Sequence, residues 1–547
     1  MSYYPENTIP VFDVPPMHTS PATERKNLLC GRAPLVIRTD SPIEDKYQTE
    51  YYNTPFSECE RLTDGVHCTE PNYKDPAFYH FTDGLGRTII CSLGALSSVE
   101  EIRLGSLKQQ DVTIHPPRCL DVRLSADGKT WMRVATERTL EGEETPVRSE
   151  YRVVFEKPYK ALYVAVDLEI WGHVWVDEIE AWGTEAIPAD AVDITPEDAA
   201  PTPDVGAYPA PDTFDGLHNL LLSYNCVPPE KIGNNHYGSA TAEEYLPHLV
   251  YFDRAGKPVD TFFDGFLYLP YSLYTYSTLY KCASGWNYYI DNVFRKGYNL
   301  DALSEATHKA GELLGIPDHK VKVYFSILHT NVAYGEHPDS FGDIDGDGVD
   351  EDMNVLSDRI KAIKWCIDTQ IERFRACGYD NLELCGFYWF EELINYRDPL
   401  EKDSLKFAVD YLHSMGLKIF WIPFFQAQGF RDWEENGFDI ASMQPNYGVR
   451  ANVRPFRLYQ NAAMAKKYGL AVEMEICRLE EEFVERFRQY MDCGAETGYM
   501  NTVKMYYQNG VPGVIYESYK SEDDNLRSLY DDLYLFAKEK YVSRKER

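Results

Sequence analysis

Hydrophobic and polar positions divide this chain into two parts with different periodicity. In residues 28–184, short segments alternate apolar with polar side chains, as Leu120, Val122 and Leu124 illustrate, and an Asp-Gly turn signal follows that segment. Strands that bury one face and are joined by tight turns are typical of antiparallel hairpins. We therefore predict an all-β sandwich over residues 28–184.

A second pattern begins after a segment without apolar periodicity. Residues 185–213 are rich in Pro, Ala and Asp, which is the composition of an interdomain linker. Beyond them, apolar strand-like runs alternate with longer amphipathic stretches such as 358–378, 405–416 and 481–494. The strand-like runs are HNLLLSY (218–224), FDGFLYLP (263–270), VKVYFSIL (321–328), NLELCGFYWF (381–390), LKIFWIPF (417–424), FDIASMQ (438–444), LAVEMEI (470–476) and GVIYES (513–518).

Eight strand–helix units in succession predict a (β/α)8 TIM barrel over residues 214–541. An open, doubly wound sheet also alternates strands with helices. No glycine-rich phosphate loop follows the first strand, so that fold is the second alternative.

Length, charge and cysteine usage narrow the class of protein. A single core rarely exceeds about 300 residues, so 547 residues fit two domains, and no apolar run is long enough to span a bilayer. The formal net charge of −33 opposes binding to nucleic acid or to an anionic membrane surface. The first residues show no signal peptide and the twelve Cys are scattered without a CxxC, so we expect a cytoplasmic protein with reduced thiols. Nothing in the sequence indicates an oligomeric state.

Two predicted barrel strands end in glutamates. The fourth ends in GFYWFEE, which contains Glu391 and Glu392, and the seventh alternates Glu473 and Glu475 with aliphatic residues. Because strand side chains alternate in direction, Glu473 and Glu475 share one face, and we expect that face to point into the barrel. A buried carboxylate is costly without a partner. The pattern therefore predicts either a functional use or an ion-pair layer with Arg or Lys.

Paired carboxyl groups at the carboxyl end of a barrel suit glycoside hydrolysis. One protonates the departing oxygen, and the other attacks the anomeric carbon or activates water. In layout, residues 215–540 resemble the retaining barrel glycosidases with acids after strands four and seven. The resemblance implies Glu392 as acid/base and Glu475 as nucleophile, with Glu473 and Glu391 as supporting acids; in that group Asn typically stands where this chain has Glu391. Inversion, a non-catalytic carbohydrate-binding protein and a metal-assisted lyase or isomerase remain alternatives.

Aromatic and polar residues near other strand ends are predicted to complete a sugar pocket. Aromatic faces with a few amide and carboxylate groups suit an oligosaccharide or glycoside, and aromatic residues make up 14% of the chain. The predicted substrate-binding residues are Asp264, Tyr268, His329, Asn331, Trp389, Trp421, Gln426, Gln444, Asn446, Tyr516 and Glu517.

An acidic stretch after the third strand, FGDIDGDGVDED, follows the start of a D-x-D-x-D-G calcium loop. Oxygen ligands on a tight turn are what Ca²⁺ prefers. The twelfth position is Asn354 in place of a bidentate Glu, so a complete EF-hand is not predicted. We expect either a solvated acidic loop or a structural Ca²⁺, with no cofactor for catalysis. The predicted ligands are Asp343, Asp345, Asp347 and Glu351.

Each half also shows a narrower resemblance. GFYWFEE, VEMEI and the acidic stretch are similar to the barrel proteins of the DUF4855 family, which supports the architecture more than a reaction. In the first half, LTDG (62–65), LSADGKTWMRV (124–134) and ALYVAVDLEIWGHVWVDEIEAWG (161–183) resemble the discoidin or galactose-binding-like (F5/8 type C-like) jelly roll. This implies a jelly-roll domain that either binds sugar or serves as a structural partner of the barrel.

Overall fold

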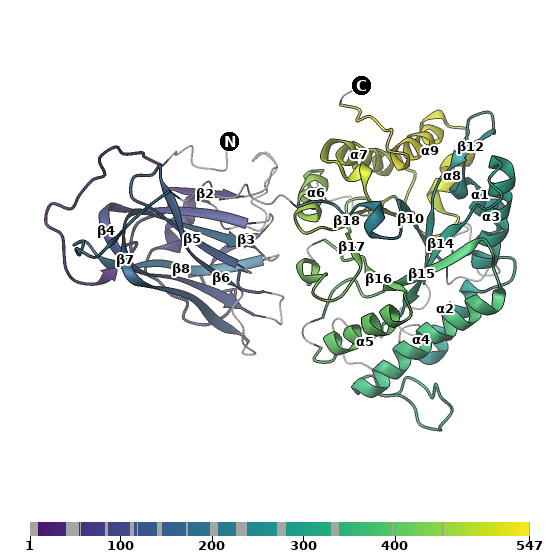
Figure 1. Ribbon diagram of the computed structural model, residues 1–547, viewed down its shortest axis with the longest axis horizontal. Helices are drawn as coiled ribbons and strands as arrows, with labels where there is room; N and C mark the ends of the chain where they lie inside the picture. The colour runs from purple at the N-terminus through teal and green to yellow at the C-terminus, as the bar shows by residue number, and fades with distance from the viewer. Residues whose placement is uncertain are drawn as a thin grey trace. The chain divides into compact units, whose positions relative to one another are not determined.

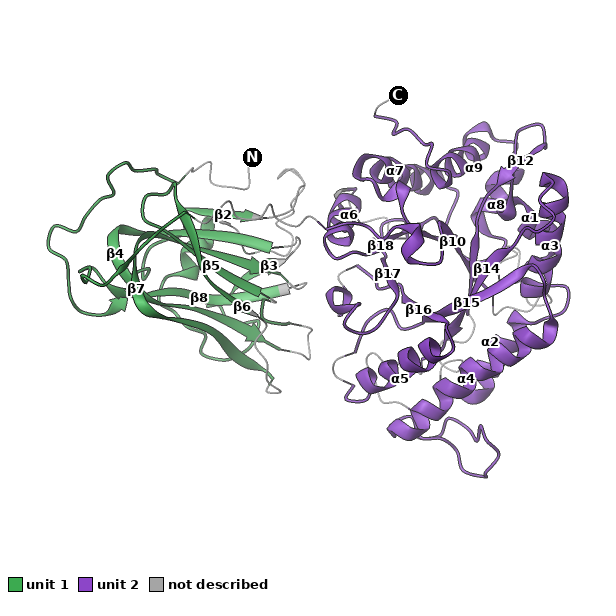
Figure 2. Cartoon of the chain, in the orientation of Figure 1, with its two compact units in different colours: residues 1–204 green, residues 205–547 purple. Residues whose placement is uncertain are grey.

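The computed structural model contains two compact units, Met1–Asp204 and Val205–Arg547 (Figure 2). It describes residues 9–39, 54, 56–82, 86–109, 114–117, 119–138, 145–170, 173–196, 206–225, 238–270, 281–329, 338–395, 398–425, 427, 429–449, 453 and 455–545. Each unit has its own architecture.

The first unit is an all-β unit built around two long antiparallel strands, β4 and β7 (Figure 1). The strand order is β1-β8-β4-β7-β5-β6; β2 pairs with β4, β3 pairs with β8, and β9 pairs in parallel with β7. The strands are β1 (Lys26–Asn27), β2 (Val36–Thr39), β3 (Tyr79–Thr82), β4 (Gly86–Lys108), β5 (Cys119–Ser125), β6 (Trp131–Arg138), β7 (Val147–Glu169), β8 (His173–Thr184) and β9 (Val192–Asp193), with a 3-10 segment η2 (Phe56–Leu62) before β3.

The alternation read in the sequence produces the core of this unit. Leu120, Val122 and Leu124 on β5 are fully buried. Leu120 lies opposite Leu168 of β7 and Val122 lies opposite Val166, so the apolar faces of neighbouring strands meet. The arrangement is compatible with the predicted β-sandwich. Strand β9 lies within the segment that the sequence assigned to the linker and is paired with the first unit.

The second unit contains a closed barrel of parallel strands, β10-β13-β14-β15-β16-β17-β18-β19 in chain order. Pairing of Leu220 on β10 with Met505 on β19 closes the circle. The barrel strands are β10 (Asn219–Tyr224), β13 (Gly265–Leu269), β14 (Val321–Ile327), β15 (Leu382–Trp389), β16 (Lys418–Trp421), β17 (Ile440–Met443), β18 (Ala471–Glu475) and β19 (Lys504–Tyr507).

Helices surround the barrel strands (Figure 1). They are α1 (Ala242–Leu249), α2 (Ala283–Val293), α3 (Asn299–Leu314), α4 (Leu356–Cys377), α5 (Glu401–Ser414), α6 (Phe456–Lys467), α7 (Glu481–Thr497), α8 (Gly513–Lys520) and α9 (Asp524–Ala537). The remaining elements are the hairpin β11 (Val250–Phe252) and β12 (Pro258–Thr261) and the 3-10 segments η4 (Pro211–Thr213), η8 (Phe430–Asp432) and η9 (Tyr499–Asn501). No helix in the described ranges combines the length and apolarity that a bilayer crossing requires.

Helix α4 shows how the sequence pattern forms this outer layer. Ile363, Ile367 and Ile371 repeat every four residues and are buried, which is the spacing of one helix face. Gly378 ends the helix with φ 65°, a left-handed conformation that glycine adopts without a Cβ penalty. The boundaries agree with the predicted helix over 358–378 within two residues.

The last predicted strand is wrong. Residues 513–518 form the start of helix α8, and the eighth barrel strand is β19, nine residues earlier. Val514, Ile515 and Ser518 are buried, a spacing that suits a helix as well as a short strand, and a brief apolar run does not distinguish the two. Only the need to pair with both β18 and β10 identifies β19 as the strand that closes the barrel.

Candidate active site

Three glutamates converge inside the carboxyl end of the barrel. Glu473 and Glu475 follow Ala471 on one face of β18. Ala471 belongs to the hydrophobic core that fills the barrel, which also contains Leu220, Leu222, Leu267, Leu269, Tyr324, Tyr388, Phe420, Ile422 and Met505. Both glutamates are only 3% exposed. Burial, followed by the charges of Glu475 and Glu392, raises the pKa of Glu473 well above its ordinary value. The three carboxyl groups therefore lie within electrostatic reach of one another.

Among the described residues, these acids do not form the ion-pair layer that was the alternative. In the part of the chain that the structure describes, no Lys or Arg side chain pairs with Glu473 or Glu475. Three acidic side chains are thus held together in a buried place without a compensating cation from those residues. Such an arrangement is costly for stability and is typical of functional sites.

The Glu475 carboxylate receives hydrogen bonds from two neighbouring elements. The backbone N–H of Tyr447 donates to Oε2 at 3.0 Å, and the Tyr490 hydroxyl on α7 donates to the same oxygen. Burial raises the pKa of Glu475 to about 7, while the Tyr490 hydroxyl and the Tyr447 and Gly448 backbone groups oppose that rise. These donors stabilise the ionised form, which is the form that acts as a nucleophile.

Glu392 lies just beyond the end of β15 and is half-buried. Burial raises its pKa, and a hydrogen bond from Gln444 only partly offsets the rise. Gln444 lies at the end of β17, where its amide also donates to the Ile422 carbonyl at 2.9 Å and accepts from Asn446 at 3.1 Å. Glu392 therefore keeps its proton to a higher pH than an exposed glutamate, as a general acid must.

Glu391 belongs to a different cluster from Glu392. Its Oε2 atom lies 3.8 Å from His329 Nδ1, and His329 Nε2 lies 2.9 Å from the carboxylate of Glu401 on α5. Burial raises the pKa of Glu391 to about 7. Burial also lowers the pKa of His329, but the Glu401 and Glu391 carboxylates outweigh this and leave it raised. The adjacent acids of GFYWFEE thus take part in separate polar groups.

Three half-buried aromatic side chains, Tyr224, Phe390 and Tyr507, pack on top of the core inside the barrel. The rings of Tyr224 and Tyr507 meet edge to face with centroids 5.4 Å apart. The charges of Glu392 and Glu473 both act on the Tyr224 hydroxyl and raise its pKa, together with burial and Tyr507. These aromatic groups therefore accompany the three acids at the barrel mouth.

The sequence interpretation missed Tyr224 and Tyr507. Tyr224 shares the strand face of Leu220 and Leu222, so alternation alone contained the signal. Tyr507 lies at the end of β19, the strand that was assigned elsewhere. Tyr507 could not be recognised as a residue of the barrel mouth until β19 was identified as a barrel strand.

The predicted stacking residues lie outside the barrel interior. Trp389 is 1% exposed, and Trp421 and Tyr268 are fully buried. On each of these strands, the adjacent side chains belong to the core that fills the barrel. Because side chains alternate in direction along a strand, these three point outward, toward the helices. Trp421 donates from Nε1 to the Glu391 carbonyl at 2.7 Å and stacks on Phe438. The prediction that they stack on a sugar is therefore replaced by a packing role.

Asp264 lies at the opposite end of the barrel from the three glutamates. Its carboxylate accepts from the backbone N–H groups of His218 at 2.9 Å and Asn219 at 2.7 Å, where β10 begins. Asp264 thus stabilises the amino end of the barrel and does not contribute to a pocket at the other end.

Four further predicted residues have other outcomes. Tyr516 and Glu517 lie on helix α8 and not at a strand end, because that segment is helical. Asn331 and Gln426 lie outside the described residues. Of the predicted sugar-binding groups that the structure describes, Gln444 bonds to Glu392, and Asn446 donates to Gln444.

The acidic stretch forms a compact, exposed loop. Asp343, Asp345 and Asp347 each offer a carboxylate oxygen, and these atoms lie within 4.8 Å of one another. The backbone N–H groups of Gly346 and Gly348 donate to Asp343 at 2.6 and 2.9 Å. Among the described residues, these three aspartates are the acidic group whose carboxylate oxygens lie close enough together to bind one metal ion. The glutamates at the barrel mouth do not meet this criterion.

Glu351 does not join the three aspartates. It is 2% exposed, accepts from the Ile344 backbone N–H at 2.9 Å and pairs with Lys361 at 2.5 Å. Lys361 also pairs with Asp345. The prediction of Glu351 as a metal ligand is therefore replaced by a role in anchoring the loop to α4.

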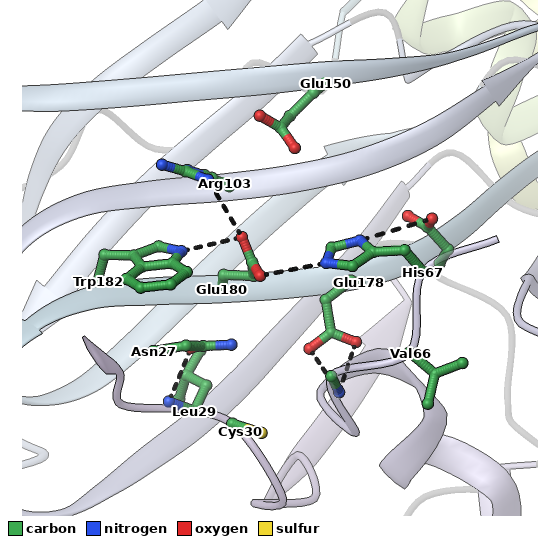
Figure 3. Close-up of polar contacts among 12 residues, drawn as sticks. Asn27, Leu29, Cys30, Val66, His67, Arg103, Glu150, Glu178, Glu180 and Trp182 are labelled. Atoms are coloured by element: carbon green, nitrogen blue, oxygen red, sulfur yellow. Dashed lines mark hydrogen bonds and ion pairs between the residues drawn. The ribbon is translucent and has the colours of Figure 1, made fainter. Parts of the chain in front are cut away.

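In the first unit, the segments 62–65 and 177–180 that carry the jelly-roll resemblance lie in contact (Figure 3). The Gly65 backbone N–H donates to both Glu178 carboxylate oxygens at 3.1 Å. Burial raises the pKa of Glu178 to about 8. On the same strand, Glu180 lies 3.5 Å from His67 Nε2 and accepts from the Trp182 indole at 3.0 Å. This network ties the loop before β3 to β8.

Comparisons with known proteins give one family and several distant folds. A family model described as a domain of unknown function (DUF4855) matches residues 229–535. No curated protein matches the chain.

Three solved structures illustrate the structural matches. A mutant of the Ruminococcus gnavus GH29 fucosidase in complex with fucose is 10% identical, with a TM-score of 0.20, and the match covers 30% of this chain and 28% of the fucosidase. CpGH89CBM32-6 produced by Clostridium perfringens is 14% identical over 29% of this chain and 99% of that chain, with a TM-score of 0.20. The lectin domain of lectinolysin complexed with Lewis B antigen is 20% identical over 28% and 95%, with a TM-score of 0.21.

Proposed function

The chain belongs to the DUF4855 family, and we propose that it is a glycoside hydrolase whose second unit is a (β/α)8 TIM barrel. The observation that carries the proposal is the convergence of Glu392 and Glu475 inside one end of the barrel. Burial raises the pKa of both carboxyl groups, and donors oppose that rise at each, the Tyr490 hydroxyl at Glu475 and the Gln444 amide at Glu392. In the proposed reaction Glu475 acts in its ionised form, which its donors stabilise, and Glu392 acts in its protonated form, which burial favours.

The proposed reaction has two steps. Glu392 donates its proton to the leaving-group oxygen while the Glu475 carboxylate attacks the anomeric carbon and forms a glycosyl-enzyme ester. The glycosidic bond breaks, and its electron pair remains on the protonated leaving group. Glu392, now ionised, then removes a proton from water, which displaces Glu475 and restores both groups.

The aromatic and amide groups of the mouth supply binding in this proposal. Tyr224 and Tyr507 contribute aromatic rings. Gln444, which bonds to Glu392, and Asn446, which donates to Gln444, contribute amides. Such a combination suits an uncharged oligosaccharide or glycoside. We propose that the first unit, as a galactose-binding-like jelly roll, serves as the carbohydrate-associated partner of this barrel.

The test is hydrolysis of a panel of aryl glycosides and oligosaccharides by the wild-type chain and by its Glu392→Gln and Glu475→Gln variants. We expect the wild type to hydrolyse at least one member of the panel and both variants to lose that activity. A carbohydrate-binding protein without catalysis would instead bind a panel member equally well before and after Glu475→Gln and hydrolyse none. That outcome would replace the proposal with its first alternative.

Tyr490→Phe tests the hydrogen bond that holds Glu475 in its ionised form. Loss of the hydroxyl donor removes a group that lowers the pKa of Glu475, so the acidic limb of the kcat/KM profile should move upward by about one pH unit. The profile is measured from pH 4 to 9. Tyr530→Phe is the matched control, because that buried hydroxyl donates to the carbonyls of Pro247 and Val250. An acidic limb that is the same in both variants would remove Tyr490 from this role.

We also propose that Asp343, Asp345 and Asp347 hold a structural Ca²⁺. Three carboxylate oxygens within 4.8 Å suit its preference for oxygen ligands. Binding to the folded state should raise Tm, by RT ln(1 + [Ca²⁺]/Kd) in free energy, and we expect a rise of about 2 to 4 °C in excess Ca²⁺. Differential scanning calorimetry with Ca²⁺, with Mg²⁺ and with chelator measures it.

The control for this calcium prediction is Asp345→Asn with Asp347→Asn, which should abolish the calcium-dependent shift. Equal Tm values for the wild type in Ca²⁺ and in chelator would identify the stretch as a solvated acidic loop. If hydrolysis also ceases in chelator but survives in the double variant, a metal-assisted reaction elsewhere in the chain becomes the better account.

A further inference from the structure

Glu473 occupies a position that the two-carboxylate reaction does not use. It lies on the inner face of β18, two residues before Glu475, in register with Met505 of β19. Met505 belongs to the core that fills the barrel, so Glu473 lies at the boundary between that core and the mouth. Its side chain is 3% exposed.

The Glu473 carboxyl group has no protein partner among the described residues. No hydrogen bond or ion pair reaches it there, whereas Glu475 receives donors from Tyr447 and Tyr490, and Glu392 receives one from Gln444. Buried carboxyl groups are ordinarily hydrogen-bonded, because a buried polar group without a hydrogen-bond partner costs free energy. An unpartnered acid beside the reacting pair therefore indicates that a ligand supplies the missing partner.

The groups that face Glu473 favour its uncharged form. They are the carboxyls of Glu475 and Glu392 and, from β10, the Tyr224 hydroxyl. None of these is a cation, and burial itself opposes ionisation, so the pKa of Glu473 is raised well above that of an exposed glutamate. A protonated carboxyl group is a hydrogen-bond donor as well as an acceptor.

We propose that Glu473 is a third substrate-contacting residue, whose uncharged carboxyl group donates a hydrogen bond to a hydroxyl of the sugar bound between Glu392 and Glu475. The inference rests on the proposed hydrolase function and names a residue that selects the substrate. A site that hydrogen-bonds a substrate hydroxyl rejects an analogue without that hydroxyl, since the buried donor is then left unpaired. Glu473 thus requires a hydroxyl at one particular position of the sugar ring.

The first test compares Glu473→Gln with Glu473→Leu. Glutamine keeps an uncharged donor of the same shape, so kcat/KM should stay within about tenfold of wild type. Leucine removes the donor, and kcat/KM should fall by about a hundredfold or more. The monodeoxy analogues of the best substrate provide a readout that a structural role would not move. One of them should be much poorer for the wild type and no poorer than the parent for Glu473→Leu.

Infrared spectroscopy provides a readout that does not depend on hydrolysis. Other buried carboxyl groups, such as Glu178, are also protonated near pH 7, so the readout is the difference spectrum. At pH 7 the wild type minus Glu473→Gln should contain a protonated carboxyl band. Glu383→Gln, which changes an exposed glutamate near the start of β15, is the matched control and should keep the band. Thermal unfolding of each variant confirms that it is folded.

Separate results overturn the inference and the proposed function. If Glu473→Gln is as inactive as Glu475→Gln and no band is lost, Glu473 acts as an ion and the inference is wrong. If Glu473→Leu keeps wild-type turnover and the same ranking of deoxy analogues, the residue has only a structural role. If the wild type hydrolyses nothing, the proposed function fails, and calorimetric binding of the same sugars to wild type and Glu473→Leu decides whether Glu473 contacts a sugar.

Discussion

Glu475→Gln is expected to lower kcat for an aryl glycoside by about 10³-fold or more, with KM changed only a few-fold. Glutamine preserves the shape of the side chain and can still accept from the Tyr447 backbone N–H and the Tyr490 hydroxyl. It cannot form the glycosyl-enzyme ester. Steady-state kinetics on the same substrate measure the loss, with Glu383→Gln as the control for an exposed glutamate on a barrel strand.

A smaller substitution makes the role of Glu475 more specific. Glu475→Gly opens space in which azide can attack the anomeric carbon, so added azide should restore turnover and yield a glycosyl azide. Restoration by azide is not expected of a residue that merely stabilises the barrel. Turnover of Glu475→Gln within tenfold of wild type would show that Glu475 is not the nucleophile.

Glu392→Gln is expected to have the second largest effect, and the effect depends on the leaving group. For an oligosaccharide or an alkyl glycoside, loss of the proton donor should lower kcat/KM by about 10²- to 10⁴-fold. For a dinitrophenyl glycoside, whose leaving group needs no proton, bond cleavage should change little. Comparison of kcat/KM for the two substrate types in each protein measures the difference.

The pH profile provides the accompanying check on Glu392. Its pKa is raised by burial, and the acid form is required, so wild-type activity is lost as pH rises through that raised pKa. Glu392→Gln should abolish this alkaline limb. Glu391→Gln is the matched control, because Glu391 belongs to the cluster with His329 and Glu401. If the alkaline limb persists in Glu392→Gln and is lost in Glu391→Gln, then Glu391 and not Glu392 is the general acid.

The architecture was largely predictable because periodicity reports which faces of strands and helices are buried. The alternation at Leu120 and Val122 and the spacing of Ile363 and Ile367 are local properties, and each became a buried face in the structure. The short apolar run 513–518 did not distinguish a strand from a helix, and it forms part of helix α8. A strand of four residues such as β19 is defined by its partners more than by its own sequence.

The sequence by itself determined the two-part organisation, the inward face of VEMEI and the presence of acids at two strand ends. Tertiary structure decided which aromatic residues join those acids. Trp389 and Trp421 are residues of the type that stacks on sugars, but strand alternation and barrel closure turn them toward the helices. Tyr224 and Tyr507 lie at the barrel mouth instead. Tertiary structure also shifted the pKa values of the acids, because a carboxyl pKa depends on burial, donors and neighbouring charge, which come from elements distant in the chain.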